Sequence, residues 1–205
     1  PDKNISMVGS KPLIFWTIEA ARKAKKLEKI IISTDSEKYA SICKNYNIEC
    51  GVIGIGDNST RKKVVEYVYQ ICSNFKFETF LHPKSNIGKN VIIGDGTVVM
   101  SGVSVNSDTK IGSHCIVNTN SSVDHDCNLG DYVSVSPNSG IGGNVNIGDQ
   151  SFIGIGSNII HNINIGNNNV IGSSSLVIRD IDSFILGYGI PFREIKKIKE
   201  NEKYL

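Results

Sequence analysis

An aliphatic residue recurs at every sixth position from Leu81 to Val177, seventeen times without interruption. With 40% of the chain hydrophobic, chance produces such a run in one register on the order of once in ten million trials. A period of six fits neither an α-helix, with about 3.6 residues per turn, nor a strand that alternates every second residue. It fits a coil with three flat sides of six residues each, which repeats every eighteen residues.

Two further positions of the repeat support this coil. The position two before each aliphatic residue is mostly small or β-branched, as a narrower inward site requires. The position after the aliphatic residue is often glycine, which we expect to tolerate corner dihedrals that a Cβ resists. Together these features predict a mainly β fold: a left-handed parallel β-helix of hexapeptide repeats, preceded by a small α/β, truncated Rossmann-like segment. Roughly five coils at a strand spacing of about 4.8 Å give a rod about 25 Å long.

The chain divides into three predicted parts. Residues 1–80 alternate helix and strand and form the small α/β segment, residues 81–182 form the β-helix, and residues 183–205 form a loop and a short helical tail from Arg193. Helix caps and apolar runs predict the following elements in the first part: a helix after Pro12, a strand at Ile30–Ile32, a helix at Glu37–Tyr46, a strand at Ile48–Ile55 and a helix at Thr60–Ser73. Phe77–Leu81 then leads the chain into the first coil.

Composition excludes several classes of protein. A formal net charge of +2 argues against nucleic acid as a partner. The five cysteines form no CxxC pair, which argues against a disulfide framework or a zinc ribbon. No apolar run is long enough to span a bilayer and no signal peptide is seen, so we expect a cytoplasmic protein without a membrane partner.

His125 is the strongest candidate for chemistry. It lies between Asp124 and Asp126, two positions past an inward valine, where an outward side chain on a rigid rod is expected. A neighbouring carboxylate can fix the imidazole tautomer and stabilise the imidazolium, as a general base requires. One coil of eighteen residues further on is Gly143, whose N–H is a candidate oxyanion donor, and one more coil leads to His161.

The first quarter of the chain resembles the acylneuraminate (CMP-sialic acid) cytidylyltransferases. The resemblance covers Pro1 to about Glu49 and rests on four stretches: Pro1-Asp2-Lys3-Asn4, Gly9-Ser10-Lys11-Pro12-Leu13-Ile14, Trp16-Thr17-Ile18-Glu19-Ala20 and Ile32-Ser33-Thr34-Asp35-Ser36. The glycine-rich phosphate-binding start of that family is missing here. The segment points to sialic-acid-type sugars by association only.

The remainder, from about Gly54, is similar to the sialic-acid O-acetyltransferase (NeuD) and bacillosamine-type acetyltransferase (PglD) family. Arg61-Lys62-Lys63, His82-Pro83, Asn118-Thr119 and Asp124-His125-Asp126-Cys127 carry this likeness. The resemblance implies that His125 is the catalytic base, that Asp126 raises its basicity, and that Gly143 lies near the thioester oxygen. It also implies that acetyl-CoA lies in a groove between neighbouring subunits. The positions that line this groove correspond to Ser134, where the family commonly has a second histidine, Ile155 and Ser173.

We therefore expect an acetyl-CoA-dependent N- or O-acetyltransferase that acts on a sialic-acid-type sugar or a nucleotide-linked amino sugar, with no metal. A base on the flat outer surface of the β-helix needs a second surface opposite it to form a binding groove. A neighbouring subunit can supply that surface, which predicts a homotrimer. Two alternatives stay open. One is a metal enzyme similar to the γ-carbonic anhydrases, which would use His114, His125 and His161. The other is an inactive scaffold derived from such a transferase.

Overall fold

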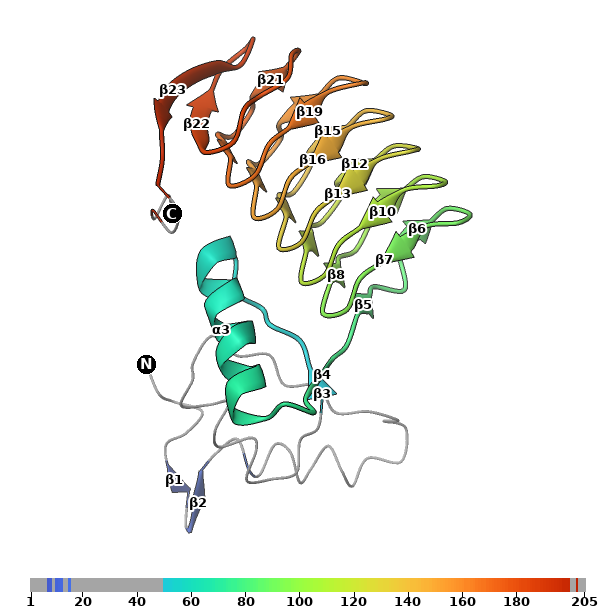
Figure 1. Ribbon diagram of the computed structural model, residues 1–205. Helices are drawn as coiled ribbons and strands as arrows, with labels where there is room; N and C mark the ends of the chain where they lie inside the picture. The colour runs from blue at the N-terminus through green and yellow to red at the C-terminus, as the bar shows by residue number, and fades with distance from the viewer. Residues whose placement is uncertain (1–6, 9, 13–14, 16–49, 200–201, 203–205) are drawn as a thin grey trace.

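The computed structural model describes residues 7–8, 10–12, 15, 50–199 and 202. Within them, coils stack from the strand at Phe80–Leu81 to the C-terminal strands, with one helix beside the stack (Figure 1). The elements predicted between Pro12 and Glu49 lie outside the described residues. Before them, β1 (Met7–Val8) and β2 (Lys11–Pro12) form a short antiparallel pair that was not predicted. No helix in the described ranges has both the length and the apolarity needed to cross a bilayer.

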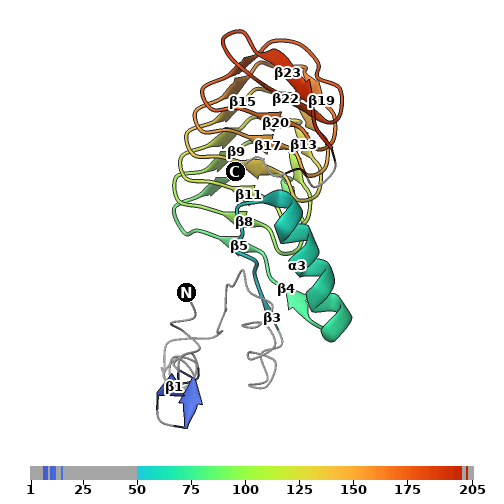
Figure 2. The same cartoon turned by 90° about the vertical axis from the view of Figure 1, so that its left-hand side faces the viewer.

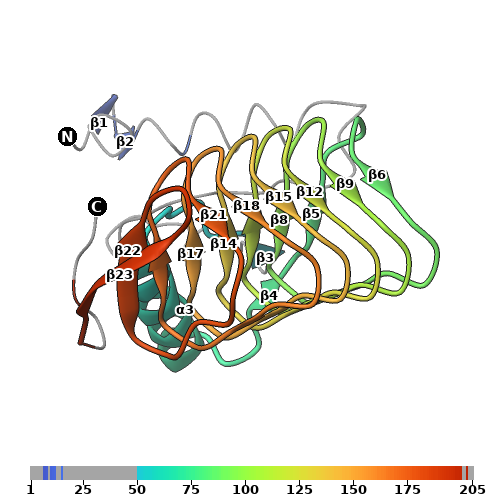
Figure 3. The same cartoon turned by 90° about the horizontal axis from the view of Figure 1, so that it is seen from above.

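The coils form three parallel sheets of two-residue strands, as the period of six predicts (Figure 3). We call the sheets the first, second and third face, in chain order from β6. The first face has six strands: β6 (Asn86–Ile87), β9 (Ser104–Val105), β12 (Ser122–Val123), β15 (Gly140–Ile141), β18 (Asn158–Ile159) and β21 (Leu176–Val177). The second face has five: β7 (Ile92–Ile93), β10 (Lys110–Ile111), β13 (Asn128–Leu129), β16 (Asn146–Ile147) and β19 (Asn164–Ile165).

The third face has eight strands and extends to the C-terminal end of the stack. It contains β5 (Phe80–Leu81), β8 (Val98–Val99), β11 (Ile116–Val117), β14 (Ser134–Val135), β17 (Phe152–Ile153), β20 (Val170–Ile171), β22 (Ile185–Tyr188) and β23 (Arg193–Lys197). The helical tail predicted from Arg193 is wrong at its start, because Arg193–Lys197 pairs antiparallel with β22. All five residues of β23 are exposed, and the pairing with β22 provides partners for backbone groups that a lone strand leaves free.

The register between neighbouring coils is eighteen residues from β5 to β21, and it falls to sixteen where β20 pairs with β22. Val117 pairs with Val99 below it and with Val135 above it, and equivalent pairs occur on all three faces. These aliphatic side chains form one continuous core; Val99, Val117 and Val135 are all fully buried. The small position two residues earlier is buried as well, as expected, for example at Thr97 and Cys115. The hydrophobic period therefore determines the architecture, because each buried side chain stacks on its equivalent one coil away.

The glycines after the aliphatic position have a different role from the one predicted. Their backbone is not left-handed; positive φ occurs two residues later, mostly at asparagine and aspartate such as Asn120 (57°) and Asp126 (56°). A Cβ on Gly142 would lie 2.7 Å from the His161 nitrogen, and one on Gly88 2.8 Å from the Ser107 nitrogen. At these glycines the backbone of the next coil approaches too closely for a Cβ, whereas other coils carry side chains at the same repeat position, such as Asn106 and Asp124.

A βαβ unit precedes the coils, as predicted for this part. β3 (Cys50–Gly51) and β4 (Lys76–Phe77) are parallel and are joined by α3 (Asn58–Ile71), whose N-cap Asp57 accepts a hydrogen bond from Thr60 N. The predicted strand at Ile48–Ile55 is shorter than expected within the described residues. α3 lies along the side of the β-helix (Figure 2).

The guanidinium of Arg61 joins α3 to the coils. This side chain is 1% exposed and donates to the carbonyl oxygens of Ile55 (2.7 Å), His114 (2.8 Å) and Tyr132 (2.9 Å). It also donates to the side-chain oxygens of Asn58 and Ser134. A buried guanidinium is stable only when its donors are paired, so these contacts explain how a charge is accommodated inside this interface.

Candidate active site

His125 lies at the corner between the first and the second face. We call this corner, made by residues 88–90, 106–108, 124–126, 142–144 and 160–162, the base corner. Hydrogen bonds connect its coils one above another: Asp126 N donates to Ser107 O (3.1 Å), and Asn144 N donates to His125 O (2.9 Å). Asn162 N likewise donates to Gly143 O (3.0 Å). The column of His125, Gly143 and His161 that the eighteen-residue count predicts is therefore present, and Ser107 extends it one coil below His125.

The imidazole of His125 is paired with the carboxylate of Asp126. The distance between His125 Nδ1 and Asp126 Oδ2 is 2.8 Å, and both side chains are 61% exposed. An ionised carboxylate only accepts hydrogen bonds, so Nδ1 carries the proton and Nε2 of the neutral ring is left with a free lone pair. The hydrogen bond to Asp126 raises the pKa of His125, and the charge of Asp124 raises it further. His125 thus has the tautomer and the increased basicity that suit a general base.

Gly143 lies directly against the imidazole of His125. A Cβ on Gly143 would be 2.8 Å from both Cε1 and Nε2 of the ring, which is closer than real Cβ contacts come. The Gly143 N–H has no hydrogen-bond acceptor within the described part of the chain. The lone pair of an exposed base therefore lies beside a buried glycine whose N–H is unused, an arrangement that suits acyl transfer.

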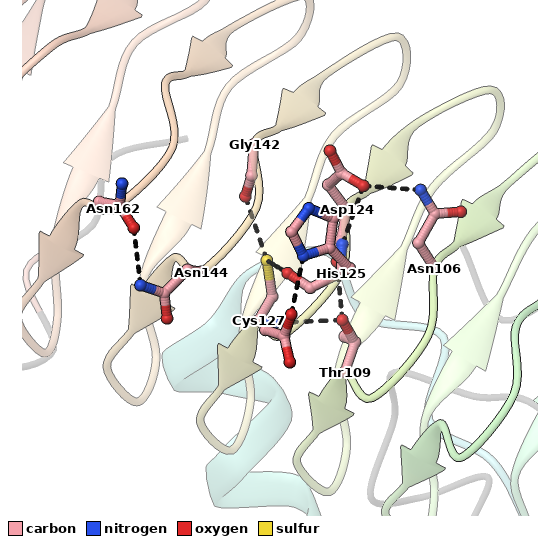
Figure 4. Close-up of polar contacts among 9 residues, drawn as sticks. Asn106, Thr109, Asp124, His125, Cys127, Gly142, Asn144 and Asn162 are labelled. Atoms are coloured by element: carbon pink, nitrogen blue, oxygen red, sulfur yellow. Dashed lines mark hydrogen bonds and ion pairs between the residues drawn. The ribbon is translucent and has the colours of Figure 1, made fainter.

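Four further residues hold the turn that carries His125 (Figure 4). Asp124 Oδ1 accepts from His125 N (2.9 Å) and from Asn106 Nδ2 (2.7 Å), and these two bonds lower the pKa of Asp124. From the inner side, Thr109 Oγ1 donates to Asp124 O (2.7 Å) and Cys127 Sγ donates to Gly142 O (3.1 Å). Burial raises the pKa of the Cys127 thiol. Sequence reasoning missed Asn106, although Asn106 precedes Asp124 by the same eighteen residues that separate His125 from Gly143.

Ile155 and Ser173 form a separate column at the corner between the third and the first face. Ser174 N donates to Ile155 O (2.8 Å), which places the two one above the other; both are exposed, Ile155 by 54%. We call this corner, residues 154–156 and 172–174, the isoleucine corner. In one chain it does not meet His125, because the two corners border opposite edges of the first face.

Ser134 lies apart from both corners. It is 5% exposed, and its hydroxyl donates to Asn58 Oδ1 (2.6 Å) and accepts from Arg61 Nη2 (3.1 Å). Its role as an acetyl-CoA contact stays a prediction. His114, one of the three histidines of the metal-enzyme alternative, is buried between the rings of Phe77 and Tyr132 at the corner between the second and the third face.

Comparison with known proteins identifies two different relationships. A family model described as cytidylyltransferase matches residues 1–79, which extends past the predicted limit near Glu49. The N-acylneuraminate cytidylyltransferase of Escherichia coli is 44% identical over 48 residues, 23% of this chain and 12% of that protein. The match thus spans only about an eighth of the curated N-acylneuraminate cytidylyltransferases.

The coils match solved acetyltransferase structures. PerB from Caulobacter crescentus, in complex with CoA and GDP-perosamine, superposes with a TM-score of 0.74 at 30% identity and covers 78% of this chain and 77% of its own. The acetyltransferase domain of PglB from Neisseria gonorrhoeae, in complex with acetyl coenzyme A, has a TM-score of 0.71 at 28% identity and covers 76% of each chain. With its eighteen-residue register and His125 corner, the chain belongs to the family of acetyltransferases built on a left-handed β-helix of hexapeptide repeats.

Proposed function

We propose that the protein transfers an acetyl group from acetyl-CoA to an amine or hydroxyl of a sialic-acid-type sugar or a nucleotide-linked amino sugar, with His125 as the general base. The observation that carries this proposal is the arrangement of Asp126, His125 and Gly143. The carboxylate holds Nδ1 at 2.8 Å, while Cε1 and Nε2 lie against the backbone of Gly143.

The chemistry follows from these positions. Nε2 of His125 takes the proton of the acceptor amine or hydroxyl while its nitrogen or oxygen attacks the thioester carbonyl carbon. Asp126 stabilises the imidazolium that forms, and the Gly143 N–H donates to the oxyanion of the tetrahedral intermediate. When the intermediate collapses, the carbon–sulfur bond breaks and coenzyme A leaves as the thiol with the proton from His125. General-base help of this kind is worth roughly a hundred- to ten-thousand-fold.

The isoleucine corner supports a homotrimer with shared sites. Ile155 and Ser173 are proposed to line the acetyl-CoA groove, yet in one chain they lie on the other edge of the first face from His125. A threefold arrangement places the isoleucine corner of one copy beside the base corner of the next, which supplies the second wall. Ser134 is proposed to contribute to the groove only indirectly, because its hydroxyl is already bonded to Asn58 and Arg61.

The acceptor class rests on resemblance at both ends of the chain. PerB was crystallised with GDP-perosamine, a nucleotide-linked sugar, and the N-terminal segment matches cytidylyltransferases of acylneuraminate sugars. These likenesses favour acceptors in which an amine or hydroxyl is carried on a sugar ring.

The test is an acetyl-transfer screen that measures free thiol released from acetyl-CoA. The acceptors are sialic acids, their CMP derivatives, and UDP- or GDP-linked amino sugars. We expect one acceptor class to support thiol release and His125→Ala to lower its rate at least a hundred-fold. His82→Ala, a histidine change in the first coil, should leave the rate unchanged. A wild-type protein inactive with every acceptor, or a His125→Ala variant at the wild-type rate, contradicts the proposal.

A further inference from the structure

The carboxylate of Asp124 forms a second connection between His125 and the coil below. Asp124 Oδ1 accepts from the backbone N–H of His125 at 2.9 Å and from Asn106 Nδ2 at 2.7 Å (Figure 4). The carboxylate thus fixes the main chain at His125, while Asp126 fixes its ring. Asn106 is the side chain that holds this carboxylate from the neighbouring coil.

The column that contains these two side chains holds both glycines and larger residues, with Ile160 one coil above Gly142. The equivalent positions one coil below Asn106 and one coil above Asp124 are Gly88 and Gly142, where a Cβ would press against the backbone of the next coil. Side chains replace glycine at the two coils that meet at His125, and they are bonded to each other. Side-chain hydrogen bonds across one coil also join Asn90 to Asp108 and Asn144 to Asn162. The Asn106–Asp124 bond differs from them because the same carboxylate oxygen also accepts from the backbone N–H of His125.

We propose that Asn106 is a positioning residue for acetyl transfer, which acts on His125 through Asp124. The inference rests on the proposed function of His125 as the general base. Asn106 makes no proton transfer itself. It holds the Asp124 carboxylate against the His125 N–H, and so keeps the base oriented toward Gly143 and keeps a negative charge beside the ring.

Loss of this hydrogen bond has two expected effects. The Asp124 side chain gains freedom to turn into solvent, so the backbone at His125 loses one restraint and the ring leaves its place beside Gly143 more often. The charge that helps to raise the pKa of His125 also moves away, so that pKa falls toward its ordinary value. The charged groups beside the ring are Asp124 and Asp126; the coils below and above present Ser107 and Gly143.

The experiment compares Asn106→Ala with Asn146→Ala. Asn146 is a matched control, because its Nδ2 bonds to Asn164 Oδ1 across one coil (2.9 Å) on the second face, away from His125. A displacement of about 1 Å of a catalytic group can lower the rate roughly a hundred-fold. Asn106→Ala removes only one of the restraints on His125, so we expect kcat to fall by about ten-fold with little change in the KM of the acceptor. The acid limb of its kcat/KM profile should move to lower pH. Asn146→Ala should match the wild type in both.

A second readout does not depend on activity. The Hε1 resonance of His125, assigned by its absence in His125→Ala, should titrate at lower pH in Asn106→Ala than in the wild type or in Asn146→Ala. An Asn106→Ala variant that matches Asn146→Ala in kinetics and titration overturns the inference. A variant that only raises the acceptor KM overturns it too, because it assigns Asn106 to substrate binding. If the wild type transfers acetyl to no acceptor, the proposed function fails, and the titration still decides the role of Asn106.

Discussion

At the scale of single residues, the contact between Gly143 and the His125 ring is the most exacting feature of the site. Nε2 and Cε1 occupy space that any other residue at this position would need for its Cβ. The backbone of Gly143 is not in the left-handed region, so alanine can adopt its conformation. A substitution here acts on the base while the coil stays intact, because the nearest obstacle is a side chain that can rotate.

We therefore expect Gly143→Ala to lower acetyl transfer by about a hundred-fold, because it displaces the His125 ring by an ångström or more. The far-ultraviolet circular dichroism spectrum and the melting temperature should stay close to those of the wild type. Gly56→Ala is the matched control, since a Cβ on Gly56 meets no atom within 4 Å. Full activity in Gly143→Ala would show that the ring position seen here is unimportant for transfer.

Sequence reasoning reached part of this site. The period of six determines the register, and the register places Gly143 one coil above His125. The contact between Asp126 and the ring follows from their adjacency in the chain and from the direction of both side chains, which the register does not give. The same count could have paired Asn106 with Asp124, but a count gives proximity and not the direction of a side chain. The sequence did not indicate the burial of Arg61, because an arginine followed by two lysines is typical of a solvated helix face. The strand at Arg193–Lys197 was missed because its pairing partner β22, not its own composition, determines its structure.

At the scale of elements, the packing of α3 against the coils depends on the hydrogen bonds of the Arg61 guanidinium. Replacement by methionine keeps most of the packed volume but removes every donor, which leaves buried carbonyl oxygens of His114 and Tyr132 without their hydrogen bonds. We expect Arg61→Met to lower the free energy of unfolding by about 3–5 kcal/mol, measured by urea denaturation. Lys63→Met removes the same charge from an exposed neighbour on the same helix and should change little. Equal stabilities of the two variants would contradict this role for Arg61.

The stability of the protein should depend on pH through His114, which packs between Phe77 on β4 and Tyr132 in the coils. Burial, followed by the nearby charge of Arg61, lowers the pKa of His114 to about 4 from its usual 6.5. Between these values the unfolded chain binds a proton that the folded chain does not. The contribution of neutral His114 is therefore complete above about pH 6.5, and about 3 kcal/mol of it is lost as the pH falls to about 4.

His114→Phe removes this titration. Aromatic residues already occupy the equivalent corner position with positive φ at Tyr132 (59°) and Phe184 (65°), so the backbone accommodates the change. Urea denaturation at several pH values between 7.5 and 4 should show a smaller loss of stability in His114→Phe than in the wild type. Parallel losses in the two proteins would argue against this assignment.

At the scale of the whole molecule, the proposed trimer can be tested by complementation. Sedimentation should give three times the chain mass of 22.3 kDa. His125→Ala disables the base corner and Ile155→Asp disables the isoleucine corner, and each proposed site combines one of each from two neighbouring chains. In mixed trimers about a quarter of the sites receive both intact corners, so co-expression of the two variants should restore about a quarter of wild-type activity. His125→Ala with Gly143→Ala should restore none, because both changes lie on the base corner of the same chain. No recovery in the first pair would mean that each chain carries a complete site.

The contacts of Arg61 between α3 and the coils also determine which substitutions this interface tolerates. Four of its acceptors are main-chain carbonyl oxygens, those of Ile55, Gly56, His114 and Tyr132. A guanidinium that binds carbonyl oxygens responds to the path of the backbone and is indifferent to which side chains those residues carry. Side chains at these four positions can therefore be substituted while α3 keeps its position against the coils, as long as the backbone path is unchanged. The position of α3 against the coils is therefore set by backbone geometry at Ile55, Gly56, His114 and Tyr132.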